Sequence, residues 1–158
     1  MKLPVLQAKR PCAGCTACCS VLGVAPLDKQ PFEPCKHCVE TGCGIYETRP
    51  KICGEFDCLW QGGTGEEQDR PDRLGVIFAP TNGPVDFTGQ IEIQAYEVVP
   101  NAFASPRVVA VAKLFTAHGL LVIGHVHGGG RFRFMGPADK IAKAQRWAES
   151  TLDKPSRA

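Results

Sequence analysis

The distribution of cysteine constrains this chain more than any other feature of its sequence. All nine cysteines lie within the first 58 residues, and the remaining hundred residues contain none. They are Cys12, Cys15, Cys18, Cys19, Cys35, Cys38, Cys43, Cys53 and Cys58. A segment with this many thiols is either cross-linked by disulfide bonds or organised around bound metal.

Metal binding is the better interpretation of these thiols. The first ten residues carry cations but no long apolar core and no small-residue cleavage site, so they do not resemble a signal peptide. We therefore expect a cytoplasmic protein, whose thiols stay reduced. The odd number of cysteines would also leave one thiol over in any full disulfide scheme. Because reduced, closely spaced thiols bind soft and borderline metals, the sequence predicts a zinc or iron site.

Charge and hydropathy give no reason to expect a nucleic acid or a membrane as a further ligand. The chain is 44% apolar and 22% charged, with a formal net charge of +2, which is typical of a soluble globular protein. No apolar run approaches the roughly 20 residues that span a bilayer. The expected partner is a metal ion, and a protein partner is left open.

The first four cysteines form the pattern Cys12-x-x-Cys15-x-x-Cys18-Cys19. A C-x-x-C turn lets two thiolates reach one metal ion while backbone amides stabilise their charge. Adjacent side chains diverge in both helix and strand, so the sulfurs of Cys18 and Cys19 do not face one metal in the same way. Either one of them bridges, or the pair serves two metal positions. The structural alternative is that one of these two cysteines binds no metal and is buried as a small apolar side chain.

The later cysteines lie in distinct sequence patterns. After Cys35 come the patterns Gly42-Cys43-x-Ile45-Tyr46-x-x-Arg49-Pro50-x-x-Cys53 and Phe56-Asp57-Cys58. Together with the opening pattern, residues 12–60 resemble the CxxCxxCC (YkgJ-type) zinc- or iron-chelating domain family of small bacterial proteins, and the motif is similar to a segment of the flagellin lysine methylase. The resemblance implies eight metal-binding cysteines, which are Cys12, Cys15, Cys18, Cys19, Cys35, Cys43, Cys53 and Cys58. It leaves out Cys38.

Eight thiolates allow three arrangements that the spacing does not separate. They fit two mononuclear sites of four cysteines, one bridged dinuclear site, or one iron–sulfur cluster with the other cysteines elsewhere. The hypothesis requires the sulfur atoms to gather within reach of a shared ion. Sulfur atoms scattered more than a coordination sphere apart would contradict it.

Three histidines are weaker candidates for the same chemistry. His37 lies between Cys35 and Cys38 and could replace a thiolate, although a hydrogen bond or contact with water is the commoner role. His125 and His127 would share one face of a predicted strand, but they have no cysteine or carboxylate near them in sequence. The cations that could offset the charge of metal thiolates are Arg10, Lys36, Arg49 and Lys51.

The fold class predicted for the whole chain is α+β. Residues 1–60 should form a loop-dominated cysteine-rich metal-binding module, packed on a small antiparallel sheet with two helices in residues 61–158, as one compact unit. Alternating and short apolar runs predict strands over 74–79, 85–88, 91–98, 120–126 and 131–135, and capping signals predict helices over 106–117 and 138–152. Within the module, a short helix is expected near Leu27 and another from Thr48, carrying Cys53 and Cys58 near its far end.

The sequence leaves enzymatic activity undecided. The first hypothesis is a metal-binding protein, and the alternative is an iron–sulfur or iron-dependent enzyme that acts on a protein substrate, as the methylase resemblance implies. A metal-delivery protein is a third interpretation. No dinucleotide fingerprint or nucleophile motif is present, and residues 128–131 lack the ending of a phosphate-binding loop.

Overall fold

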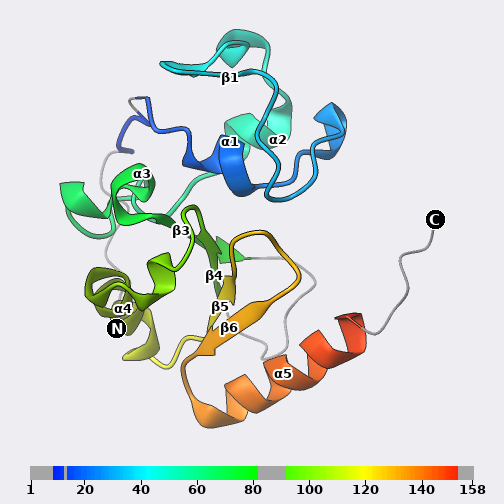
Figure 1. Cartoon of the computed structure of the whole chain (residues 1–158). Helices are drawn as coiled ribbons and strands as arrows, with labels where there is room; N and C mark the ends of the chain where they lie inside the picture. Colours follow the sequence, from blue (N-terminus) through cyan, green and yellow to red (C-terminus); the bar gives the residue numbers. More distant parts are fainter. Residues whose placement is uncertain (1–8, 13, 82–91, 153–158) are drawn as a thin grey trace.

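The structure is a computed structural model that describes residues 9–12, 14–81 and 92–152. Its architecture is α+β, as the sequence predicts. The cysteine-rich segment, defined here as residues 12–58, lies at one end of the molecule, and the sheet with its long helices forms the other end (Figure 1). Within the described ranges, no helix has the length and apolar character needed to cross a membrane.

The cysteine-rich segment is built from very short elements. They are α1 (Ala17–Val21), η1 (Ala25–Leu27), β1 (Cys38–Val39), β2 (Gly42–Cys43), η2 (Tyr46–Thr48) and α2 (Lys51–Glu55). The helix expected from Thr48 is shorter than predicted: α2 ends at Glu55, so Cys58 lies beyond it. Near Leu27 the chain forms a 3-10 turn that ends, rather than begins, at that residue.

The second part of the chain contains the longer elements. They are η3 (Glu67–Asp69), α3 (Pro71–Leu74), β3 (Val76–Thr81), β4 (Glu92–Glu97), η4 (Ala102–Ala104), α4 (Pro106–Thr116), β5 (Val122–His125), β6 (Phe132–Met135) and α5 (Ala138–Leu152). Four of the five predicted strands and both predicted helices are present with small shifts of their ends. The fifth predicted strand, 85–88, lies outside the described residues.

The sheet is mixed, and the expectation of an antiparallel sheet was wrong at one pair. The strand order is β3-β4-β5-β6. β3 pairs with β4 and β5 with β6 in antiparallel fashion, whereas β4 and β5 run parallel. The parallel pair follows from α4, which carries the chain back along the sheet before β5 begins, as a crossover helix does between parallel strands.

One face of the sheet packs against α4. Ser105 and Pro106 occupy the N-cap and first positions of this helix, where proline is tolerated because its missing N–H needs no partner. The buried residues of this layer are Val76, Phe78, Ile93, Ala95 and Val122 from the strands, and Val108, Val111, Ala112 and Phe115 from the helix. The helical spacing gives α4 one apolar stripe, which covers this face.

The opposite face is shared by two different elements. Over β5 and β6, Ile123, Phe132 and Phe134 pack with Ile141 and Ala144 of α5. Over β3 and β4, Ile77 and Tyr96 pack with Ala17 and Val21 of α1 and with several cysteines. Cross-strand pairing of Ile77 with Tyr96, and of Tyr96 with His125, places these side chains on this same face. The cysteine-rich segment therefore rests on half of one sheet face.

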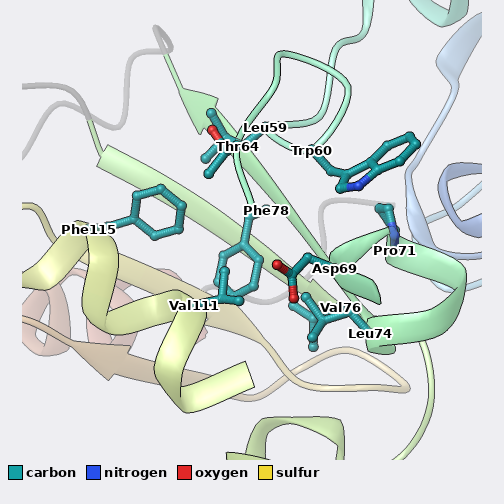
Figure 2. A pocket seen from close by; sticks show the side chains of 10 residues that line it. All are labelled: Leu59, Trp60, Thr64, Asp69, Pro71, Leu74, Val76, Phe78, Val111 and Phe115. Atoms are coloured by element: carbon teal, nitrogen blue, oxygen red, sulfur yellow. The ribbon is translucent and has the colours of Figure 1, made fainter. Parts of the chain in front are cut away.

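The turn after Cys58 packs closely against the sheet. Figure 2 shows side chains from this turn, η3, α3, β3 and α4 around a hollow of only about 10 Å³, which is room for a single water molecule at most. The rings of Phe78 and Phe115 meet there with their centroids 5.6 Å apart. This hollow is part of the packed core and offers no ligand site.

Candidate metal centre

The eight cysteines of the predicted ligand set line one cavity. It has a volume of about 930 Å³, and its cysteines are Cys12, Cys15, Cys18, Cys19, Cys35, Cys43, Cys53 and Cys58. Cys38 is not among the residues that line it. All nine cysteines are free thiols rather than disulfides.

The cavity lies between the cysteine-rich segment and the sheet. Ile77, Tyr96 and His125 contribute from the sheet, and Phe32 and Phe56 from the cysteine-rich segment. Phe32, Phe56, Ile77 and Tyr96 also belong to one apolar cluster with Ala17 and Val21. This apolar surround limits the access of water to part of the thiol set, which strengthens electrostatic interactions inside the cavity.

The first turn of the motif is formed by the backbone. The Cys15 N–H donates to the Cys12 carbonyl at 2.9 Å, and α1 begins two residues later. Ala17 and Val21, at 3% and 1% exposure, anchor this helix on the sheet. Because Cys18 and Cys19 lie between these two residues in α1, the anchored helix fixes their positions. A hydrogen bond from the Cys19 thiol lowers the pKa of Cys18.

A small hairpin carries the middle cysteines. The Cys35 N–H donates to the Cys19 carbonyl at 2.9 Å, and the Cys38 N–H donates to the Cys35 carbonyl at 2.9 Å. β1 and β2 place Cys38 directly opposite Cys43. Gly42 has φ of 137°, a conformation that side chains rarely adopt, so glycine suits the return of this hairpin.

Cys58 is tied to the beginning of the described chain through Gln61. The Gln61 N–H donates to Cys58 Sγ at 3.4 Å. The Gln61 carbonyl accepts a hydrogen bond from the Arg10 N–H at 2.9 Å. These two contacts hold the stretch before Cys12 beside the stretch after Cys58, which are far apart in sequence.

Burial favours the protonated form of three of these thiols in the absence of metal. It raises the pKa of Cys15 and of Cys58, and it raises the pKa of Cys53, with a further increase from neighbouring Cys19, Cys35 and Cys43. A metal ion that binds here must displace these protons. Its affinity is therefore expected to rise with pH.

The sulfur atoms share a cavity but not a coordination sphere. Among residues 9–12, 14–81 and 92–152, no group of three or more histidine, cysteine, aspartate or glutamate side chains is arranged closely enough to hold a metal ion. The strict expectation of sulfur atoms already gathered around an ion is therefore not met. The donor types match the thiolate chemistry of zinc and iron, but ligation requires the walls of the cavity to move inward.

The candidate histidines occupy different surroundings. His125 lines the cavity; its Nε2 lies 2.6 Å from Gln94 Oε1, and its ring stacks on Tyr96 with centroids 4.5 Å apart. Burial lowers the pKa of His125 to about 4, so its imidazole is neutral at physiological pH. His127 lies beyond the end of β5, and its N–H donates to Glu97 Oε2 at 2.9 Å. The prediction that both imidazoles share one strand face was therefore wrong. His37 lines the cavity as well.

In the described part of the chain, four lysine and arginine side chains line the cavity, and two of them, Lys9 and Lys29, were not singled out from the sequence. Arg10 and Arg49 line the cavity, and the Arg49 guanidinium lies 3.6 Å from the centroid of the Tyr46 ring. Lys29 also lines the cavity, although it is only 7% exposed. Its ammonium group donates a hydrogen bond to the Leu22 carbonyl. The thiols that interact with it most strongly are those of Cys35 and Cys19. Lys51 instead pairs with Glu55 at the surface. No sequence signal marked Lys29, because Asp28 and Glu33 lie near it in sequence, as they would beside an ordinary surface lysine, and its burial is a property of the fold.

Comparison of the chain with family models, with curated proteins and with solved structures finds no match.

Proposed function

We propose that this protein binds zinc or iron through the thiolates of the eight cysteines that line the cavity. We also propose that it is related to the CxxCxxCC (YkgJ-type) family, whose ligand pattern it resembles. A site of this kind needs reduced thiols, which favours a reducing compartment such as the cytoplasm.

The observation that carries the proposal is the agreement between two selections of cysteines. The family resemblance selects eight of the nine cysteines and leaves out Cys38. The cavity is lined by the same eight and not by Cys38. The first selection uses only motif spacing and the second only the position of atoms in space, so their agreement supports a common role for the eight.

The proposal requires the sulfur atoms to move together when an ion binds, because no three of them among the described residues are placed to hold one. Thiolate metal sites are rarely formed before the ion binds, because ion binding and local folding are coupled. The elements that carry the thiols have at most five residues each and depend on a few backbone hydrogen bonds, so they can rearrange at little cost. Protein interiors are normally close-packed, and contraction around metal would remove much of the 930 Å³ cavity.

A second candidate function is an iron–sulfur or iron-dependent enzyme that acts on a protein substrate. The size of the cavity favours it, since 930 Å³ lies within the range of roughly 300–1,000 Å³ typical of ligand pockets. The neutral His125 and the phenol of Tyr96 at the sheet face are groups that could contact a substrate.

Purification without oxygen, followed by analysis of metal and acid-labile sulfide, tests both candidates. The proposal predicts a protein with bound zinc or iron. Colourless zinc protein supports the chelating function, whereas a brown protein with sulfide supports the cluster enzyme. Serine at any of the eight cavity cysteines should lower the bound metal, and Cys38→Ser, the matched control, should retain it. Protein without metal after supply of both ions would disprove the proposal.

A further inference from the structure

We infer that the eight cysteines form two separate ligand sets of four, each holding one metal ion, with Cys18 and Cys19 divided between them. The first set is Cys12, Cys15, Cys18 and Cys58, and the second set is Cys19, Cys35, Cys43 and Cys53. The inference rests on the proposed function and adds the pairing of ligands, which sequence spacing leaves open.

The first set is assembled where the two ends of the cysteine-rich segment meet on the sheet. Cys15, Cys18 and Cys58 pack in the same apolar cluster around Ile77. Cys12 is joined to Cys15 by the hydrogen-bonded turn of the motif. Cys18 and Cys58 each interact electrostatically with both Cys12 and Cys15. The contacts through Gln61 hold the chain before Cys12 against Cys58.

The second set is assembled by the hairpin and α2, away from the apolar cluster. Backbone hydrogen bonds connect Cys35 to Cys19 and the hairpin that carries Cys43 to Cys35. Cys53 interacts electrostatically with Cys19, Cys35 and Cys43, so each other member of this set lies near it. These three are the thiols that act on Cys53 most strongly.

The helix geometry of α1 explains why two adjacent cysteines belong to different sets. Consecutive residues of a helix point about 100° apart. Cys18 packs in the cluster formed with Ile77. The Cys19 carbonyl instead accepts a hydrogen bond from the Cys35 N–H, and the Cys19 thiol contacts the Cys38 thiol. The side chains of Cys18 and Cys19 remain within hydrogen-bond distance of each other, which makes the two sets neighbours.

One buried cation lies beside the second set. Four thiolates and one divalent ion carry a net charge of about −2, which nearby cations stabilise. The thiols that act most strongly on Lys29 are Cys35 and Cys19, both of the second set, and Cys18 acts on it less strongly. Lys29 would therefore offset part of the charge of the second set.

Two double variants with matched chemistry test the pairing. Cys12→Ser with Cys58→Ser removes two ligands from the first set, and Cys53→Ser with Cys58→Ser removes one ligand from each set. If wild-type protein holds two ions, the Cys12→Ser, Cys58→Ser variant should lose one ion and the Cys53→Ser, Cys58→Ser variant should lose both. This result would be the opposite of what distance along the chain suggests, because Cys53 and Cys58 are closer in sequence than Cys12 and Cys58 are. Loss of both ions from the first variant, or of one ion from the second, would overturn the pairing.

Cadmium bound to the unaltered protein gives the same answer without risk to folding. Correlation of each ¹¹³Cd resonance with cysteine β-protons should show two resonances, each coupled to one of the two sets. A cysteine coupled to both resonances would indicate a bridged dinuclear site and would overturn the inference while leaving the proposed function intact. A single cadmium resonance would also overturn the inference and leave the proposed function intact. Protein that binds no metal would overturn both the inference and the proposed function.

Discussion

His125 belongs to the sheet but faces the cavity of the cysteine-rich segment. Its hydrogen bond to Gln94 and its stacking on Tyr96 fix the ring without supplying a charge partner. Burial in such a place disfavours the charged form of an imidazole. The fold thereby holds a neutral histidine beside eight thiols.

The pKa of His125 predicts a loss of stability in mild acid. Its ordinary value of 6.5 is lowered to about 4 in the folded protein, so the unfolded chain binds this proton more readily. The neutral imidazole therefore contributes to the free energy of unfolding above pH 6.5, and this contribution is lost as the pH falls toward 4. The loss is at most about 3 kcal/mol. Metal-free protein should show this decrease in the free energy of unfolding, and His125→Gln should show less of it.

Direct titration of the imidazole separates this explanation from others. A carbon or nitrogen resonance of His125 that titrates near its ordinary value of 6.5 would contradict the prediction. So would an equal acid dependence of unfolding in wild type and His125→Gln, because other groups would then account for it.

At the scale of elements, the side chain of Arg107 attaches η3 to α4 through ion pairs with Asp69 and, more weakly, Glu66. Arg107 Nε and Nη2 each donate to the Asp69 carboxylate at 2.7 Å, and the Glu66 N–H donates to it at 2.8 Å. The Asp69 side chain is 3% exposed, and the Arg107 guanidinium lowers its pKa. This pair fixes η3, in the turn that follows Cys58, to α4.

Removal of the arginine should therefore destabilise the fold markedly. In Arg107→Ala the buried Asp69 carboxylate keeps the hydrogen bond from the Glu66 N–H but loses its cation, and such a loss costs about 2–4 kcal/mol. The matched control is Arg73→Ala, since Arg73 and Glu67 form an exposed pair, worth under about 1 kcal/mol. Denaturant unfolding measures both variants. Equal effects would show that the buried pair contributes no more than a surface pair.

Sequence periodicity predicted the helices and strands whose apolar pattern is contained in their own residues. Residues 138–152 form α5 with the predicted bounds, and β4 matches its alternating pattern closely. The parallel pairing of β4 with β5 was missed because strand direction depends on the path of α4 rather than on strand residues. The helix thought to reach Cys58 ends at Glu55, after Gly54, since glycine weakens a helix and Phe56 is extended.

The sequence could select the eight cysteines that line the cavity, but it could not predict how the cavity is arranged. Spacing and resemblance selected these cysteines, because those are properties of the sequence. The packing of Cys18 against Ile77 and the presence of Lys29, Tyr96 and His125 in the cavity wall depend on the sheet face that the segment covers. Contacts of that kind have no signature in local sequence.

At the scale of the whole molecule, the two ends differ in what holds them together. The sheet and α4 share a core of buried aliphatic and aromatic side chains. Among its described residues, 12 and 14–58, the cysteine-rich segment contributes only Ala17, Val21 and Val24 as buried apolar residues. A segment with so small a core depends on bound metal for most of its stability, if the proposed function holds.

Metal removal should therefore unfold the two ends in sequence. Chelation of the purified protein is expected to speed amide hydrogen exchange in residues 14–58 while exchange in β3, β4, β5 and α4 stays slow. Cys38→Ser should behave as wild type before and after chelation, since Cys38 does not line the cavity, and Cys58→Ser should already exchange faster before it. Exchange in the cysteine-rich segment that does not change on chelation would contradict this prediction, because the segment would then be held by its small apolar contact with Ile77 alone.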